Sequence, residues 1–122
     1  MEFNTVSVVG LGYIGLPTAA MFASRKKKVI GVDVNPVAVE TINQGKIHII
    51  EPELDMVVHA AVTEGYLKAT TEPKPADAFL IAVPTPFKND HEPDLSYIEA
   101  ASKAIAPVLN KGNLVILEST SP

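Results

Sequence analysis

Three closely spaced glycines near the start of the chain form the pattern with the clearest chemical meaning. They lie in segment 10–15 (GLGYIG), directly after the apolar run 5–9 and directly before a stretch of helical character. A glycine-rich turn between a strand and a helix presents backbone N–H groups at the positive end of the helix dipole, where a phosphate binds without Lys or Arg. The pattern therefore predicts a site for the diphosphate of a dinucleotide.

Each of the three glycines has a separate expected task. Gly10 permits the tight turn, Gly12 leaves room for the diphosphate to approach the backbone, and Gly15 lets the helix pack closely on the strand. Where this pattern stands alone, a glycine turn that binds nothing is the alternative. A second feature is therefore needed.

Asp33 supplies that second feature. It ends the next β-rich run and lies 18 positions after Gly15, close to the roughly 20-residue spacing of the acid that holds the adenosine ribose. A carboxylate accepts hydrogen bonds from the ribose hydroxyls and repels a 2′-phosphate, and segment 34–36 contains no Arg that would reverse this preference. The pair of features predicts NAD rather than NADP, whereas a lone Asp here would indicate only a helix cap.

Strand-like and helix-like segments alternate along the chain. Short apolar runs typical of strands buried on both faces of a parallel sheet occupy 5–9, 29–33, 79–83 and 114–117, with a further short strand expected at 66–69. Helices are expected at 13–24, at 36–44 with Asn35 as cap, at 53–63, and from Asp94 or Leu95 toward Val108 with a bend or end at Pro107. This order predicts an α/β fold of the Rossmann type: one doubly wound, mostly parallel sheet, cut short after about five strands.

Composition limits the classes of function. The 122 residues are 47% hydrophobic, enough for one domain, and the net charge of −4 argues against nucleic acid and anionic membranes as partners. The absence of cysteine excludes disulfides, thiolate metal sites and a Cys nucleophile within this chain. No apolar run approaches the ~20 residues of a membrane helix, and no signal peptide is apparent, so a cytoplasmic protein is expected.

Other polar groups have simpler explanations than catalysis or metal binding. The spacing of His48, His59 and His91 matches no familiar metal-ligand pattern, so no metal is expected. The acids near the start of the third expected helix complement its dipole more readily than they form a catalytic pair.

Four motifs, in this order, resemble the UDP-glucose/GDP-mannose dehydrogenases, which are nucleotide-sugar 6-dehydrogenases. They are 10–17 (GLGYIGLP), 31–33 (GVD), 82–86 (AVPTP) and 118–120 (EST), and the resemblance runs along essentially all 122 residues. Within the family, the sequence resembles the bacterial UDP-N-acetyl-D-mannosamine dehydrogenases in particular. That finer resemblance rests on segments 47–52 (IHIIEP), 84–87 (PTPF) and 90–93 (DHEP).

The resemblance implies a role for several residues. Tyr13 and Ile14 would lie against NAD beside the glycine turn, and Asp33 would hold the adenosine ribose. Thr85, in the Pro-Thr-Pro loop, would lie where the cofactor crosses the edge of the sheet. Thr120 would lie near the nicotinamide and help to hold a water molecule.

The resemblance also implies an activity that this chain cannot perform alone. The family oxidises the sugar C6 alcohol to a carboxylate in two NAD-dependent steps, through a cysteine-bound thiohemiacetal and thioester assisted by a lysine and water. This chain contains no Cys and ends at Pro122, before the parts that carry the nucleophile, the lysine and the sugar-nucleotide domain. We therefore expect an inactive N-terminal fragment, the incomplete NAD-binding domain, of a homodimeric enzyme acting on a UDP-sugar in polysaccharide biosynthesis.

Two other classes of function share these features. A stand-alone NAD-sensing module would have the same glycine turn and Asp33 but a core of its own. A Rossmann-like interaction domain would bind no dinucleotide and would pair its open sheet edge with another chain.

Overall fold

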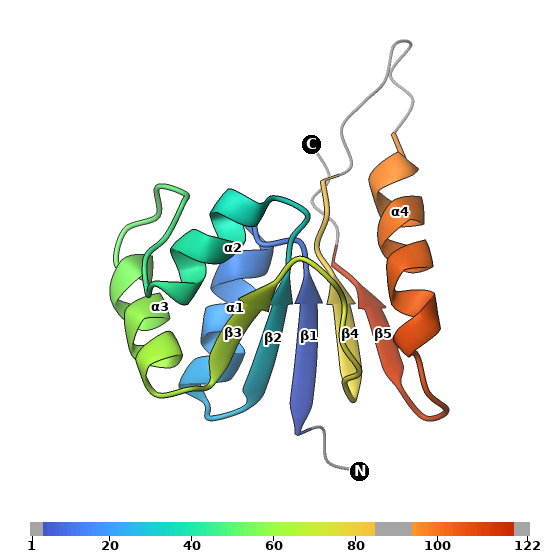
Figure 1. Ribbon diagram of the computed structural model, residues 1–122, viewed down its shortest axis with the longest axis horizontal. Coiled ribbons are helices and arrows are strands. Elements are labelled where there is room, and N and C mark those ends of the chain that lie inside the picture. Colours follow the sequence, from blue (N-terminus) through green and yellow to red (C-terminus); the bar gives the residue numbers. More distant parts are fainter. Residues whose placement is uncertain (1–3, 85–93, 119–122) are drawn as a thin grey trace.

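The protein folds around one parallel sheet with the strand order β3-β2-β1-β4-β5 (Figure 1). The computed structural model describes residues 4–84 and 94–118. The strands are β1 (Thr5–Val9), β2 (Lys28–Val32), β3 (Leu67–Thr70), β4 (Ala78–Ile81) and β5 (Leu114–Leu117). The helices described are α1 (Gly15–Ser24), α2 (Pro36–Asn43), α3 (Leu54–Thr63) and α4 (Ser96–Ile105), the last followed by a 3-10 turn at Ala106–Val108. None of these helices is long and apolar enough to cross a membrane.

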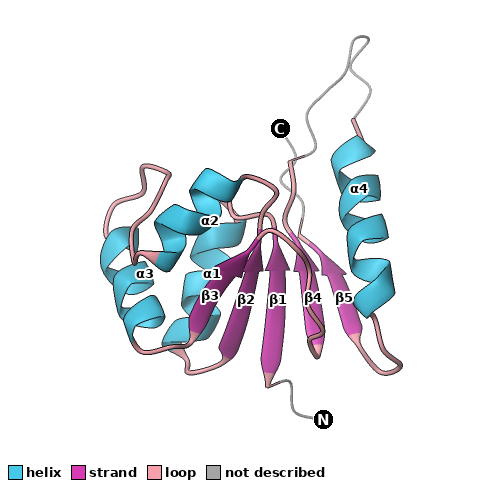
Figure 2. Ribbon diagram, in the orientation of Figure 1, coloured by secondary structure: helices cyan, strands magenta, loops and turns pink. Residues whose placement is uncertain are grey.

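The helices cover the two faces of the sheet, which confirms the doubly wound α/β prediction. Val6 and Val8 of β1 belong to a buried cluster that includes residues of α1, α2 and α3. Val9 belongs to a second cluster with Ala101 and Ile105 of α4. Because successive side chains of a strand point to opposite faces, these clusters lie on opposite sides of the sheet. Figure 2 shows α4 apart from the other three helices, and its buried residues Ala101 and Ile105 share their cluster with Phe79 and Ile81 of β4.

Most expected elements are confirmed, with shifted boundaries. The Asn35 side chain caps α2 by accepting a hydrogen bond from the Val37 N–H at 3.0 Å, and α4 gives way to a 3-10 turn at Pro107. Helix α1 begins at Gly15 rather than at position 13, because the residues before it form the glycine turn. Strand β4 ends at Ile81, two residues earlier than expected, and β3 begins at Leu67, one residue later.

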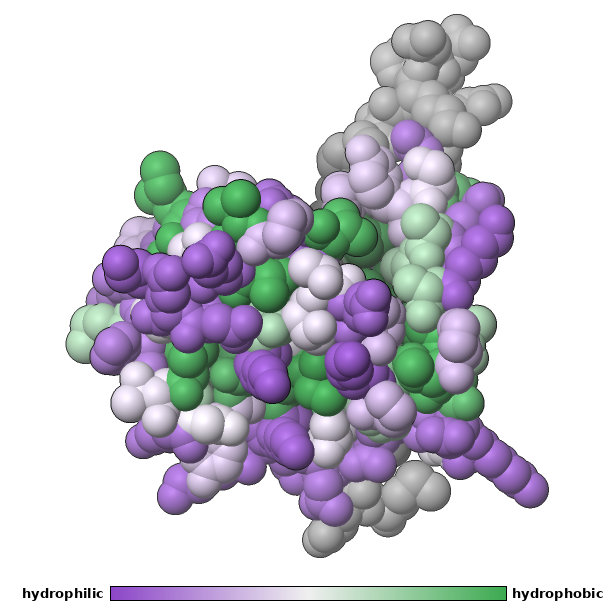
Figure 3. Space-filling model, viewed as in Figure 1, coloured by the Kyte–Doolittle hydropathy of each residue, from purple (hydrophilic) through white to green (hydrophobic). Residues whose placement is uncertain are grey.

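The expectation that segment 114–117 is buried on both faces is wrong. Its four apolar side chains are 42–52% exposed, because among the described residues β5 is an edge strand paired with β4 alone. An apolar run thus predicted the strand correctly but not its place in the sheet. On the face of the molecule seen in Figure 3, hydrophobic residues also reach the surface and are interspersed with hydrophilic ones.

The opposite edge of the sheet is closed by a side chain. Asn43, at the end of α2, donates from Nδ2 to the Ala69 carbonyl at 2.9 Å and accepts from the Ala69 N–H at 2.8 Å. The amide thus occupies backbone groups of β3 that a further strand would otherwise pair with. It also ties α2 to the strand that follows α3.

Replacing Asn43 by alanine should lower the free energy of unfolding by about 1–2 kcal/mol, because two hydrogen bonds to one backbone residue are lost. Urea unfolding of the variant measures this change. Gln44→Ala, at the adjacent exposed position, is the matched control and should stay within about 0.5 kcal/mol of the original chain. Equal stability of the Asn43 and Gln44 variants would show that the bridge contributes nothing.

Candidate functional site

The candidate site lies where the sheet changes its direction of winding. From β1 the chain crosses to β2 on one side, whereas from β4 it crosses to β5 on the other. Open α/β sheets bind ligands at this point, outside the carboxyl ends of the strands. The residues just after four strands continue the hydrogen-bond ladder: Gly10 N to Val32 O (2.7 Å), Asp33 N to Thr70 O (3.1 Å), Ala82 N to Val9 O (2.8 Å) and Glu118 N to Ile81 O (2.8 Å). Their backbones are therefore fixed along one edge.

The fold itself requires glycine at both ends of the turn. Gly10 has a φ of +98°, and a Cβ there would lie 2.6 Å from the Ala82 carbonyl oxygen. A Cβ on Gly15 would lie only 1.6 Å from the Gly10 carbonyl oxygen. Close packing of α1 against the end of β1 is thus possible only without a side chain at Gly15, as the sequence predicts.

Gly12 is different, because nothing in the chain requires it to be a glycine. A Cβ there would meet no atom within 4 Å, and its φ lies outside the left-handed range. Each of the other six glycines has either a positive φ or a close neighbour in the way of a Cβ. The open space beside Gly12 therefore leaves room for a group from outside the chain to approach the backbone.

The N-terminus of α1 faces this turn without a cap of its own. Its N-cap residue, Ile14, makes no side-chain hydrogen bond to the helix, and the first turn contains no acid. The N–H groups at a helix start lack partners within the helix, and they favour an anion at this end of the dipole. The loop can therefore hold a diphosphate through its backbone.

Asp33 fixes the turn as well as facing the site. Its Oδ2 accepts a hydrogen bond from the Leu11 N–H at 2.9 Å, and its Oδ1 accepts one from the Asn35 N–H at 2.9 Å. An ionised carboxylate can accept about four hydrogen bonds in all, so capacity remains for the hydroxyls of a ribose. The sequence predicted the ribose contact, but the tether to Leu11 joins residues 22 positions apart and required the fold to be seen.

A cavity of about 650 Å³ connects these groups. Its lining is mostly apolar and includes Val9 to Ile14, Val32 to Val34, Thr71, Pro73, Ala82 to Pro84, four residues of α4 (Tyr97, Ala100, Ala101 and Ala104), and Glu118. Within the described part of the chain, its charged lining residues are Asp33 and Glu118, with no Lys or Arg. Among these described lining residues, backbone N–H groups and the hydroxyls of Tyr13, Thr71 and Tyr97 are the donors available to a phosphate.

The predicted site residues fall into two groups. Gly10, Gly12, Tyr13, Ile14 and Asp33 line the cavity, and Gly15 lies buried at the start of α1. Thr85 and Thr120 lie outside the described residues, so their placement stays a prediction.

Two features of the cavity were not predicted. One is the alanine-rich face of α4, which leaves room beside the sheet edge; the pair Ala100 and Ala104, one helical turn apart, was an available signal. The other is a contact between residues 100 positions apart: the Thr18 hydroxyl donates to the Glu118 carboxylate, at 2.8 Å from Oε1 and 3.4 Å from Oε2. No pattern of neighbouring residues in the sequence predicts that contact.

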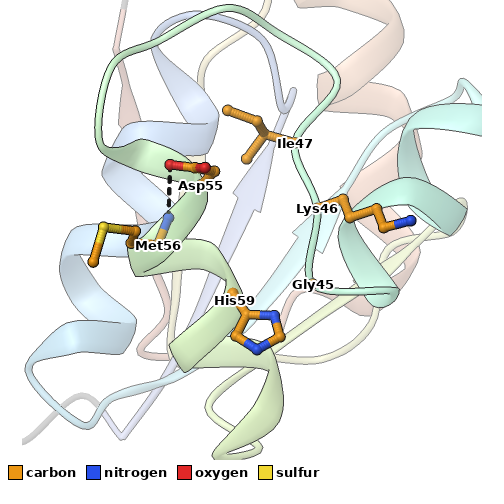
Figure 4. A pocket seen from close by; sticks show the side chains of 6 residues that line it. All are labelled: Gly45, Lys46, Ile47, Asp55, Met56 and His59. Carbon is orange, nitrogen blue, oxygen red and sulfur yellow. Dashed lines mark hydrogen bonds between the residues drawn. The ribbon is translucent and has the colours of Figure 1, made fainter.

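A second cavity, of about 570 Å³, lies between the segment after α2 and the helix α3 (Figure 4). Gly45, Lys46, Ile47, Asp55, Met56 and His59 line it. In Figure 4 the Lys46 and Asp55 side chains point away from each other, and Asp55 accepts a hydrogen bond from the Met56 N–H at 2.9 Å. The charged groups do not converge on a ligand position. Among the described residues no group of three or more metal-ligating side chains occurs.

Comparison with known families decides what class of protein has this site. Residues 4–122 match the NAD-binding domain of the UDP-glucose/GDP-mannose dehydrogenase family. The chain belongs to that family. Its resemblance to these dehydrogenases is thereby confirmed, and so is NAD as the cofactor for which this domain is built.

Individual relatives agree on the family and differ in the sugar they are named for. The chain is 75% identical to a UDP-N-acetyl-D-mannosamine dehydrogenase of Yersinia pestis and 72% identical to an NDP-N-acetyl-D-galactosaminuronic acid dehydrogenase of Ralstonia nicotianae, in both cases over 122 residues. It spans 29% of the length of each. A solved UDP-N-acetyl-mannosamine dehydrogenase from Staphylococcus aureus superposes with a TM-score of 0.92 at 45% identity, over 95% of this chain and 29% of the other.

Gly12 and Gly15, the second and third glycines of the turn, should respond differently to alanine. Gly15→Ala places a methyl group against the Gly10 carbonyl and should lower the free energy of unfolding by about 3 kcal/mol or more. Gly12→Ala places its methyl group in open space and should change that free energy by no more than about 0.5 kcal/mol. Denaturant unfolding of both variants is the measurement, and a similar loss in both would show that Gly12 too is required for folding.

Proposed function

We propose that this domain binds NAD across the carboxyl edge of its sheet, with the adenosine ribose at Asp33 and the diphosphate over the glycine turn. The observation that carries the proposal is Gly12, the one glycine that neither its backbone conformation nor its packing requires. It stands beside the uncapped start of α1, where the backbone favours an anion.

The remaining residues would divide the work of binding. Gly10 and Gly15 would hold the shape of the turn. Tyr13 and Ile14, 62% and 37% exposed, would cover the diphosphate. Val34 is 91% exposed beside Asp33 and lines the cavity, so it offers an apolar surface to the adenine.

The preference for NAD over NADP would follow from the charge of Asp33. Its carboxylate already accepts from two backbone N–H groups and would accept from ribose hydroxyls with its remaining lone pairs. A 2′-phosphate would bring negative charge against it, and no Lys or Arg among the described lining residues offsets that repulsion. Bound NAD would supply hydride acceptance, while these residues hold and orient it.

Two threonines complete the proposed site on the strength of the family resemblance. Thr85 would lie in the loop that follows β4, beside the cofactor. Thr120 would lie near the nicotinamide and help to position a water molecule. Both follow strands whose carboxyl ends border the cavity.

For the longer protein we propose a UDP-N-acetyl-D-mannosamine 6-dehydrogenase, supported by the 75% identity to the Yersinia pestis enzyme. The C6 alcohol would lose four electrons on its way to a carboxylate, in two hydride transfers to two NAD. Since this chain contains no Cys, a thiol nucleophile would have to come from outside it. Another nucleotide sugar is the second candidate, because the relative at 72% identity is named for N-acetyl-D-galactosaminuronic acid.

Calorimetric titration of the chain with NAD and with NADP tests the proposed site. NAD should bind more tightly than NADP. Asp33→Ala should weaken NAD binding by about tenfold or more and reduce its advantage over NADP, because both the ribose contact and the tether to Leu11 are lost. An unchanged ratio of the two affinities would mean that Asp33 serves only the fold.

Gly12→Val is the matched variant for the diphosphate. Its methyl groups would occupy the space in which the diphosphate approaches the backbone, so binding of both nucleotides should disappear while the chain stays folded. Undiminished NAD affinity in this variant would place the cofactor elsewhere. Absence of NAD binding at millimolar concentration by the unaltered chain would contradict the proposal for this domain.

The longer protein should form two NADH for each molecule of UDP-N-acetyl-D-mannosamine consumed, since oxidation of an alcohol to a carboxylate removes two hydrides. Absorbance of NADH together with chromatography of the sugar nucleotide gives this ratio. A ratio of one would exclude the four-electron reaction. Faster turnover of UDP-N-acetyl-D-galactosamine in the same assay would favour the second candidate.

A further inference from the structure

Glu118 is placed at the edge of the cavity by both its backbone and its side chain. Its N–H donates to the Ile81 carbonyl at 2.8 Å, which continues the β4–β5 ladder past the end of β5. Its carboxylate accepts the Thr18 hydroxyl of α1 at 2.8 Å. The residue is half-buried and lines the cavity. Its charge is thus held beside the candidate ligand space.

The two charged residues of the lining lie at opposite ends of the site. Asp33 follows β2 and Glu118 follows β5, and between these strands lie β1 and β4. The glycine turn follows β1, so the proposed diphosphate position lies between the two acids. If the adenosine ribose is at Asp33, as the proposed function has it, a dinucleotide extended along this edge directs its nicotinamide half toward Glu118.

A carboxylate at that end distinguishes the two redox forms of the cofactor. The nicotinamide ring carries a positive charge when oxidised and none when reduced. Among the described lining residues no Lys or Arg offsets the charge of Glu118, and the partial burial of the carboxylate lessens its screening by water. The oxidised ring is therefore attracted to this position more strongly than the reduced ring.

We propose that Glu118, positioned by Thr18, makes this domain prefer NAD⁺ over NADH. Thr18 is a neutral donor, so it orients the carboxylate without cancelling its charge. The inference rests on the proposed function, in which one sugar requires two NAD⁺ in succession. Weaker retention of NADH then favours its replacement by NAD⁺ between the two hydride transfers.

The test compares the dissociation constants of NAD⁺ and NADH for the 122-residue chain, measured by calorimetry and by NADH fluorescence. Glu118→Gln keeps an oxygen that can accept the Thr18 hydroxyl but removes the charge. It should lower the ratio of the NADH constant to the NAD⁺ constant by about three- to tenfold. Glu40→Gln, which removes the same charge from an exposed position on α2 outside the cavity lining, should leave the ratio unchanged.

Variants of Thr18 test whether its hydroxyl positions the Glu118 carboxylate or serves only the fold. Thr18→Val removes the hydroxyl at nearly constant volume and should lower the ratio in the same direction by a smaller factor, whereas Thr18→Ser retains the donor and should preserve it. An unchanged ratio in Glu118→Gln, with both nucleotides still bound, would overturn this inference and leave the proposed function standing. Failure of the unaltered chain to bind either form would overturn both.

Discussion

The close approach of Gly15 to the carbonyl of Gly10 is the constraint on which the site depends. A Cβ at Gly15 would lie 1.6 Å from that oxygen, so α1 can begin directly at the end of β1 only if this position lacks a side chain. That contact fixes where the helix starts and therefore where its first N–H groups lie. It also leaves Gly12 at the outside of the turn, next to open space rather than protein. The proposed anion site would thus be a consequence of how closely β1 is followed by α1.

The geometry of the glycine turn explains how a domain of negative net charge could bind a polyanion. The chain has a net charge of −4. The described lining of the cavity beside the glycine turn has two acids and no basic side chain. Backbone amides at a helix start provide local attraction that does not require a positive surface. Under the proposed function the two acids would lie to either side of the diphosphate, where they would select among ligands instead of repelling them all. Asp33 has a second effect, because its hydrogen bond to Leu11 holds the turn that carries the amides.

Local chemistry explains which parts of this structure could be predicted from sequence. The glycine turn, the Asn35 cap and the strands 5–9 and 114–117 each follow from neighbouring residues, and each was predicted at or near its observed place. The burial of β5 was predicted wrongly for the part of the chain that the structure describes, since an apolar run does not reveal how many neighbours its strand has there. The contacts of Asp33 with Leu11 and of Glu118 with Thr18 join residues 22 and 100 positions apart. They exist only because parallel strands bring their carboxyl ends to one edge.

Under the proposed function, the residues that select the sugar would differ from those that select the cofactor. The features to which the two proposals assign NAD are a backbone turn, a helix start and two carboxylates, each of which would contact the dinucleotide. Relatives at 75% and 72% identity over this same segment are named for different nucleotide sugars. If the proposed function holds, a domain of this kind can serve several sugars with little change, because its contacts are made to the part of the reaction that all of them share. Selection among sugars then requires side chains that reach the hexose itself.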